Sequence, residues 1–117
     1  MSGTLLIIND PPYGTERAYN ALRLARALVG KDGQAVRIFL IGDAVSCARS
    51  GQQVPHGYYN VETMLRAVVD RGGEVGVCGS CMDARAIEAQ ALVEGCQRSG
   101  MDELADWTVE ADRSLVF

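Results

Sequence analysis

The sequence has no uninterrupted apolar run long enough to span a bilayer, and its 11 lysine and arginine residues form no basic block. These absences argue against a membrane protein and against nucleic acid as the main partner, and the formal net charge of −4 supports the second conclusion. The opening MSGTLLIIND lacks the basic region and cleavage site of a signal peptide, so a cytoplasmic location is expected. The four cysteines are then expected to be reduced thiols rather than a disulfide framework.

The sequence also lacks the usual nucleotide-binding patterns. The stretch GTLLIINDPPYGTE has only Gly14 in its turn, without the Gly-x-Gly-x-x-Gly pattern or a P-loop lysine, and Glu16 stands where an anion would bind. No cofactor is therefore predicted. Asn9, Tyr13 and Gly14 are candidates for lining a pocket, although they are equally typical of residues that only shape a turn.

What the chain does contain is the composition of an ordinary globular domain. Hydrophobic residues make up 48% and charged residues 22% of its 117 residues. That length supports one hydrophobic core but not two, so residues 1–117 are expected to form a single domain.

Apolar runs typical of buried strands alternate along the chain with patterns of helical period. Strands are expected at Thr4–Asn9, Ala35–Ile41, Glu74–Cys78, near Cys96 and at Ser114–Phe117. Helices are expected from Thr15 as N-cap to Gly30, from Asn60 as N-cap to Gly72, at Ala84–Gln90, and after a Ser99–Asp102 capping box. The apolar side of the last helix is expected to consist of Met101, Leu104, Ala105, Thr108 and Ala111. This alternation predicts a three-layer α/β sandwich with parallel strands. Ligands then bind beyond the carboxyl ends of the strands, where NDPPYG, GDAVSCARSG and CGSCMDAR are expected to meet.

The most informative motif is the Cys-x-x-Cys of Cys78 and Cys81. Cys78 ends a strand and Cys81 follows where a helix is expected to begin, so backbone N–H groups and the second thiol would lower a thiol pKa and favour sulfur chemistry. Asp83 is expected to cap the short helix, with Arg85 offsetting its charge. The alternative is a packed structural pair, since free cysteines are often buried and inert.

A zinc site and a thioredoxin-like centre fit the motif less well. A zinc site needs four ligands, and Cys47, His56 and Cys96 have no partner at ligand spacing, so no metal is predicted. A thioredoxin-like fold places its Cys-x-x-Cys after an early strand, whereas this pair comes late. Cys47 and Cys96 are expected to be packing residues, and His56 is assigned no role. Tyr58, Tyr59 and Trp107 suit either an oligomer interface or a ligand site.

Five motifs together resemble a known family. They are PPYGTERAYNALRLARAL, FLIGDAVSCARSGQ, GYYNVETML, CGSCMDARAI and MDELADWTVEADRSLVF. On these motifs the chain resembles the DsrE/DsrF-like sulfur-relay family, in its YchN-type branch of small cytoplasmic proteins. The resemblance implies an α/β domain with about five strands between helices, assembled as a homotrimer or as a hexamer of two stacked trimers. It also implies a persulfide carried on Cys78, with Cys81 assisting, and exchange with sulfur-donor and sulfur-acceptor proteins.

One position departs from the family pattern. The resemblance leads us to expect glycine after Arg85, and the chain has Ala86, which would be strained if the position requires a positive φ. Two hypotheses remain open. Either the protein traffics sulfur, as a carrier or as a sulfurtransferase enzyme, or it is a non-catalytic oligomeric module that binds a small ligand or a metal.

Overall fold

Five parallel strands form one sheet in the order β4-β3-β2-β1-β5 in the computed structural model, which describes residues 2–117. The strands are β1 (Ser2–Ile8), β2 (Gln34–Leu40), β3 (Glu74–Cys78), β4 (Cys96–Ser99) and β5 (Arg113–Val116). The chain adds β1 to β4 in one direction across the sheet, and the last strand returns to pair with the other side of β1. All five predicted strands are present.

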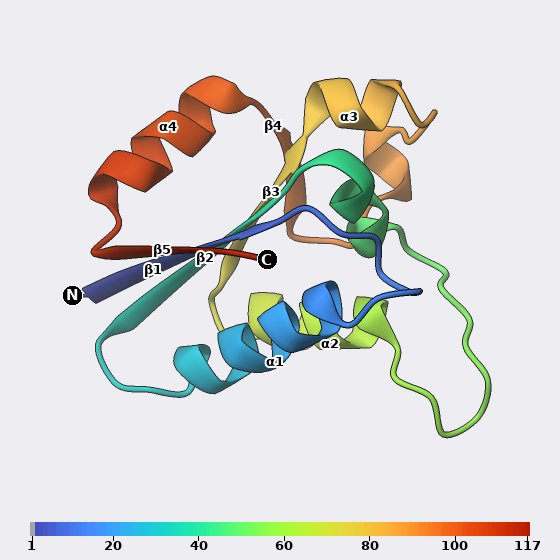
Figure 1. Cartoon of the computed structure of the whole chain (residues 1–117), viewed down its shortest axis with the longest axis horizontal. Coiled ribbons are helices and arrows are strands. Elements are labelled where there is room, and N and C mark those ends of the chain that lie inside the picture. The colour runs from blue at the N-terminus through green and yellow to red at the C-terminus, as the bar shows by residue number, and fades with distance from the viewer. Residues whose placement is uncertain (1) are drawn as a thin grey trace.

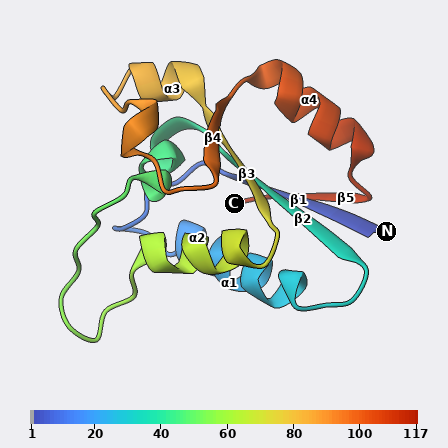
Figure 2. The ribbon, with the colours of Figure 1, turned by 180° about the vertical axis from the view of Figure 1, so that it is seen from behind.

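Helices cover both faces of this sheet. They are α1 (Arg17–Val29), α2 (Val61–Asp70), α3 (Gly79–Asp83) and α4 (Met101–Glu110), with 3-10 segments η1 (Gly42–Ala48) and η2 (Ala89–Ala91). Figures 1 and 2 show α1 and α2 on one face and α4 on the other, while α3 lies near the ends of the strands. The predicted three-layer α/β sandwich is therefore confirmed. Within residues 2–117, no helix is both long and apolar enough to cross a bilayer.

The helix periods and the central strands account for the core. In α1 the buried positions Ala18, Ala21, Leu22 and Ala25 recur at helical spacing, and the three alanines let the helix lie close to the sheet. Central strands are covered on both faces, so consecutive residues such as Ile38, Phe39 and Leu40 of β2 are all fully buried. This explains why these strands are continuous apolar runs rather than alternating ones.

Two predicted helix starts are wrong. Helix α1 begins at Arg17 after Glu16, and the Thr15 hydroxyl donates to the Asp10 carboxylate instead of capping the helix. Helix α4 is preceded by Gly100, and its predicted capping box does not form, because the Ser99 hydroxyl bonds the Glu103 side chain. By contrast, the Asn60 side chain accepts a hydrogen bond from the Thr63 N–H and caps α2 as predicted.

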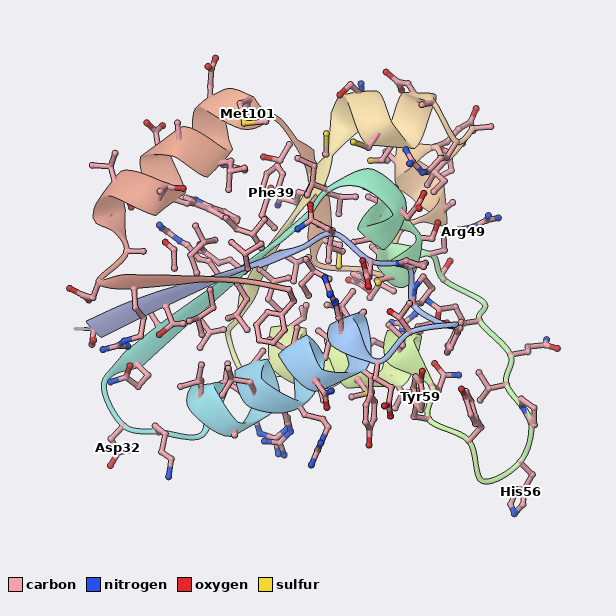
Figure 3. All side chains as sticks on the ribbon, viewed as in Figure 1. Asp32, Phe39, Arg49, His56, Tyr59 and Met101 are labelled. Carbon is pink, nitrogen blue, oxygen red and sulfur yellow. The ribbon has the colours of Figure 1, made fainter. Side chains whose placement is uncertain are left out.

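The apolar face predicted for α4 is wrong in part, although Leu104 is buried and Ala111 packs against the core as predicted. Leu104 and Trp107 are the buried positions of α4, whereas Met101, Ala105 and Thr108 are exposed. Trp107 packs edge-on against Phe39 of β2, with ring centres 6.3 Å apart and an interplanar angle of 87°. Figure 3 shows Phe39 between the sheet and α4, and Met101 at the outer end of that helix. Trp107 therefore belongs to the core. Because its large ring buries more apolar surface than the smaller residues can, it decides which face of α4 turns toward the sheet.

Candidate functional site

Cys78 lies at the point where β3 passes directly into α3. It is the last residue of the strand and the N-cap of the helix, it pairs in register with Ser99 of β4, and its exposed fraction is 7%. A side chain at Gly76, two residues earlier, would meet Phe39, Ser99 and Trp107, so this side of β3 faces α4. Because side chains alternate along a strand, the Cys78 thiol projects from the same face.

Hydrogen bonds around Cys78 favour its thiolate. Burial would raise the pKa of Cys78, but the side chains and backbone N–H groups of Ser80 and Cys81 outweigh it, and the pKa is lowered from its ordinary value. The sulfur lies 3.4 Å from the Ser80 hydroxyl oxygen. Ser80 is not among the residues predicted from the sequence, although its place inside the Cys-x-x-Cys motif was the available signal.

The second thiol links α3 to two neighbouring loops. Cys81 lies within α3 and is half-buried, and its sulfur accepts a hydrogen bond from the Gly42 N–H at 3.2 Å. Gly42 has a φ of +61°, and a Cβ there would lie 3.7 Å from the carbonyl oxygen of Asn9. The three loops after β1, β2 and β3 thus meet at the carboxyl edge of the sheet, as the sequence predicts.

The short helix begins five residues earlier than predicted, which changes the role of Asp83. The sequence predicts a helix at Ala84–Gln90, but α3 spans Gly79–Asp83, so Asp83 is its last residue and not an N-cap. Its carboxylate forms a two-pronged ion pair with Arg98 of β4, with both N–O distances 2.8 Å, and the pKa of Asp83 is lowered by that side chain.

Arg98 also lies against the start of α3. A Cβ at Gly79 would be 2.8 Å from the Cζ and Nε atoms of Arg98, so only glycine leaves room for the guanidinium beside the residue that follows Cys78. Arg98 is not among the residues predicted from the sequence, because nothing in the local pattern shows that β4 lies next to β3. Arg98 contributes a positive charge near the thiol.

Arg85 pairs with a different carboxylate from the one expected. The prediction that it offsets Asp83 is wrong, because its guanidinium donates to Asp43 of η1 at 2.8 Å and to the carbonyl oxygen of Cys81 at 3.0 Å. These contacts join the end of α3 to the loop that carries Gly42. The next residue, Ala86, has a φ of +54° and is the single non-glycine residue with a positive φ among residues 2–117. The expectation that this position favours glycine is confirmed.

The side chains of the candidates from the first loop bond other parts of the chain than the thiols. The Asn9 side chain donates to the carbonyl oxygen of Phe117, which ties the loop to the end of the chain. The Tyr13 hydroxyl bonds the Gln52 side chain and the Val61 N–H, and its ring packs against other tyrosines rather than the thiols. Gly14 has a φ of +98°, and no atom lies within 4 Å of the place that a Cβ would take, so it serves the turn.

The remaining cysteines differ from Cys78. Cys47 and Cys96 are buried, and burial raises the pKa of each to about 12, which leaves both thiols protonated at neutral pH. Figure 3 shows His56 on the long loop, pointing away from the body of the molecule. No group of three or more His, Cys, Asp or Glu side chains within residues 2–117 is placed to hold a metal ion. Cys78 is therefore the cysteine best placed to act as a nucleophile.

Relatives of the chain match it over nearly its whole length. The model of the DsrE/DsrF-like family matches residues 3–117. YchN of Escherichia coli K12 is 36% identical over all of both chains, and MK0008 of Methanopyrus kandleri is 39% identical over 96% of this chain and 91% of its own. The crystal structure of E. coli YchN matches the full chain with a TM-score of 0.94. MTH1491 of Methanobacterium thermoautotrophicum, at 12% identity, shares the fold with a TM-score of 0.81 over both full chains.

Proposed function

The chain belongs to the DsrE/DsrF-like family, which is linked to sulfur relay, and from this premise we propose that it carries sulfane sulfur as a persulfide on Cys78. The observation that carries the proposal is the contrast among the thiols. Hydrogen bonds lower the pKa of Cys78, while burial raises those of Cys47 and Cys96. A lower pKa increases the thiolate fraction at neutral pH, and the thiolate is the nucleophile.

The proposed loading reaction needs no cofactor or metal. The Cys78 thiolate attacks the outer sulfur of a donor persulfide, R–S–SH, forming Cys78–S–SH and releasing the donor as R–S⁻. Transfer to an acceptor thiolate repeats this exchange in the other direction. The Ser80 hydroxyl and the backbone N–H groups that favour the Cys78 thiolate would stabilise it again when the sulfur leaves.

Cys81 supplies a second route out of the persulfide. Its thiolate can attack the Cys78 sulfur, forming a Cys78–Cys81 disulfide and releasing HS⁻, so that atoms and charge balance. The Cys81 side chain hydrogen-bonds the Cys78 thiol, so the two sulfurs are neighbours. The hydrogen bond from the Gly42 N–H to the Cys81 sulfur would hold that sulfur in position for this step.

Intact-protein mass spectrometry tests the proposal directly. After exposure to a low-molecular-weight persulfide, the wild type should gain the mass of a sulfur atom, and a reductant should remove it. Cys78→Ser should gain none, Cys81→Ser should hold the sulfur longer, and Cys96→Ser is the matched control that should behave as the wild type. Equal loading of Cys78→Ser would refute the assignment. Turnover with an acceptor thiol would distinguish a sulfurtransferase from a stoichiometric carrier.

The alternative hypothesis makes the opposite prediction at the same thiol. A non-catalytic oligomeric module for a small ligand or a metal would show no sulfur gain, and Cys78 would alkylate no faster than a free thiol. Native mass spectrometry of the purified protein would then reveal a retained ligand. The lowered pKa of Cys78 favours the sulfur-carrying function over this one.

We further propose that the domain of residues 1–117 works in the cytoplasm as a homotrimer or a hexamer, with sulfur-donor and sulfur-acceptor proteins as partners. Exposed apolar side chains support self-association, since Met101, Val109 and Val116 have exposed fractions of 61%, 86% and 69%. Val116 also belongs to the edge strand β5, one side of which is unpaired in the sheet. Size-exclusion chromatography with light scattering would refute the assembly if the protein were a monomer at micromolar concentration.

A further inference from the structure

All four tyrosines of the chain gather on one surface, and we propose that they bind the guanidinium group of an arginine side chain on a partner protein. Two of these tyrosines come from the loop before α2, one from the loop before α1 and one from α1 itself. The proposal goes beyond sulfur carriage, because neither Cys78 nor Cys81 takes part in it. We call this group the tyrosine cluster, formed by Tyr13, Tyr19, Tyr58 and Tyr59.

Three rings of the cluster form a column. The Tyr59 ring centre lies 4.3 Å from that of Tyr19 and 4.5 Å from that of Tyr58, with interplanar angles of 33° and 24°. Tyr58 is at one end of this column, and its exposed fraction is 51%. A large aromatic ring that packs on a neighbour and still leaves half its surface in water offers area for a ligand. Figure 3 shows Tyr59 beside the first turn of α2.

The fourth ring holds the column in place. Tyr13 packs beside both loop tyrosines, with ring centres 6.4 Å from Tyr58 and 5.8 Å from Tyr59. Its hydroxyl donates to the Gln52 side chain at 2.6 Å and accepts from the Val61 N–H at 3.1 Å. The rings are thus ordered before a ligand arrives, which reduces the entropy lost on binding.

The charge beside the column suits a cation. An open depression of about 450 Å³ is lined by the three column rings and by Gly14, Thr15 and Glu16. Within residues 2–117 the Glu16 carboxylate has no ion-pair partner, whereas Arg17 next to it is paired with Asp10. The net charge of −4 adds a general preference for cations over anions.

Guanidinium fits this surface better than an ammonium group. The tyrosine cluster already contacts one guanidinium of this chain, because the Cζ atom of Arg23 lies 5.4 Å from the centre of the Tyr19 ring. A guanidinium is planar, so it can stack on the exposed Tyr58 ring and pair with the Glu16 carboxylate through two N–H groups. A compact ammonium cannot make both contacts in the same way.

The shallow shape of the depression points to a side chain rather than to a free small molecule. Sites for small ligands enclose most of the ligand surface, whereas this depression covers a group from one side. An arginine carried by a partner makes its remaining contacts outside the depression. We therefore assign the position to an arginine side chain of a protein surface.

The test titrates the protein with N-acetyl-arginine amide and follows the tyrosine ring protons by NMR. We expect saturable shifts of the tyrosine cluster with a Kd of tens of millimolar, roughly what one exposed cation–π contact and one exposed ion pair together supply. N-acetyl-citrulline amide, the neutral isostere, should bind at least about fivefold more weakly, and higher salt should weaken the arginine probe alone. Trp107 fluorescence should not change, because that ring is buried against Phe39.

Matched variants locate the binding position. Tyr58→Ala and Glu16→Gln should each weaken binding about threefold or more, while Tyr58→Phe, which keeps the ring face, and Glu94→Gln, a remote change of the same charge, should leave it unchanged. Equal binding of the citrulline probe, or no saturable shift, would overturn the proposal. Tighter binding of free arginine than of the capped probe would overturn the assignment to a side chain in favour of a small-molecule site. Sulfur loading of Cys78 is measured separately, so failure of either proposal leaves the other intact.

Discussion

Replacing Ala86 by glycine should stabilise the protein. Ala86 has a φ of +54°, a region that costs an L-residue about 1 to 2 kcal/mol because Cβ approaches the neighbouring carbonyl. Glycine avoids that cost, but its extra freedom in the unfolded chain removes roughly 0.5 to 1 kcal/mol of the gain. Ala86 is exposed, so loss of its methyl group sacrifices little buried surface. The net expectation for Ala86→Gly is a rise of about 0.75 kcal/mol in the free energy of unfolding, the difference between the midpoints of these two ranges.

Ala84 provides the matched control in the same turn. It is also exposed, but its φ of −63° and ψ of −18° are ordinary helical values. Ala84→Gly should therefore lower the free energy of unfolding by about 0.5 to 1 kcal/mol, the opposite sign. Urea denaturation followed by circular dichroism measures both values, and the melting temperatures should move apart by several degrees. If both variants lost stability equally, the strain at Ala86 would be refuted.

Three further predictions concern the thiol site and acid stability. Cys78 should alkylate faster near neutral pH than the other two buried cysteines. Ser80→Ala should raise the pKa of Cys78 and slow this reaction at pH 7. A pH–rate profile of iodoacetamide labelling measures both effects, and an unchanged profile in the variant would contradict the role of Ser80. Gly79→Ala should displace the Arg98 guanidinium and thereby also raise the pKa of Cys78. The same alkylation profile measures this change, and unchanged labelling of Cys78 would contradict it. The Asp112 carboxylate accepts a hydrogen bond from the Gly3 N–H, which lowers the pKa of Asp112. It therefore contributes stability above its unfolded pKa of about 4 that is lost as the pH falls through its folded value, and Asp112→Asn should flatten the acid limb of a stability–pH curve.

The fold was predictable from the sequence because its signals are periodic. The strands are continuous apolar runs, and the small residues of α1 repeat at helical spacing, so element order and parallel pairing followed. The errors fall at helix ends. Thr15 and Ser99 are good capping residues by type, but each bonds a nearby carboxylate instead, and the competition between such partners is decided by the folded geometry.

The candidate site was predictable only in its local part. Cys78, Cys81 and the unfavourable backbone at Ala86 lie within one short stretch, where spacing and residue type carry the information. The contacts that join this stretch to the rest of the site come from distant segments. The Gly42 N–H donates to Cys81 from the segment after β2, and the Arg98 side chain of β4 lies against Gly79. The spacing of residues in the Cys-x-x-Cys motif predicts neither contact. Such partners become visible when the strand order is known.

The pairing of β5 with β1 bears on how the protein is made. One of the two strands that pair with β1 lies more than 100 residues away in the sequence, since Thr4 pairs with Arg113 and Ile7 with Val116. A parallel sheet of this kind has no hairpins, so its contacts are mostly non-local and are expected to form slowly. During synthesis on the ribosome, one edge of β1 stays unpaired until Arg113–Val116 emerge, and nascent chains can associate through that edge throughout the interval. Expression at low temperature or with chaperones should therefore raise the yield of folded protein more than changes to its surface.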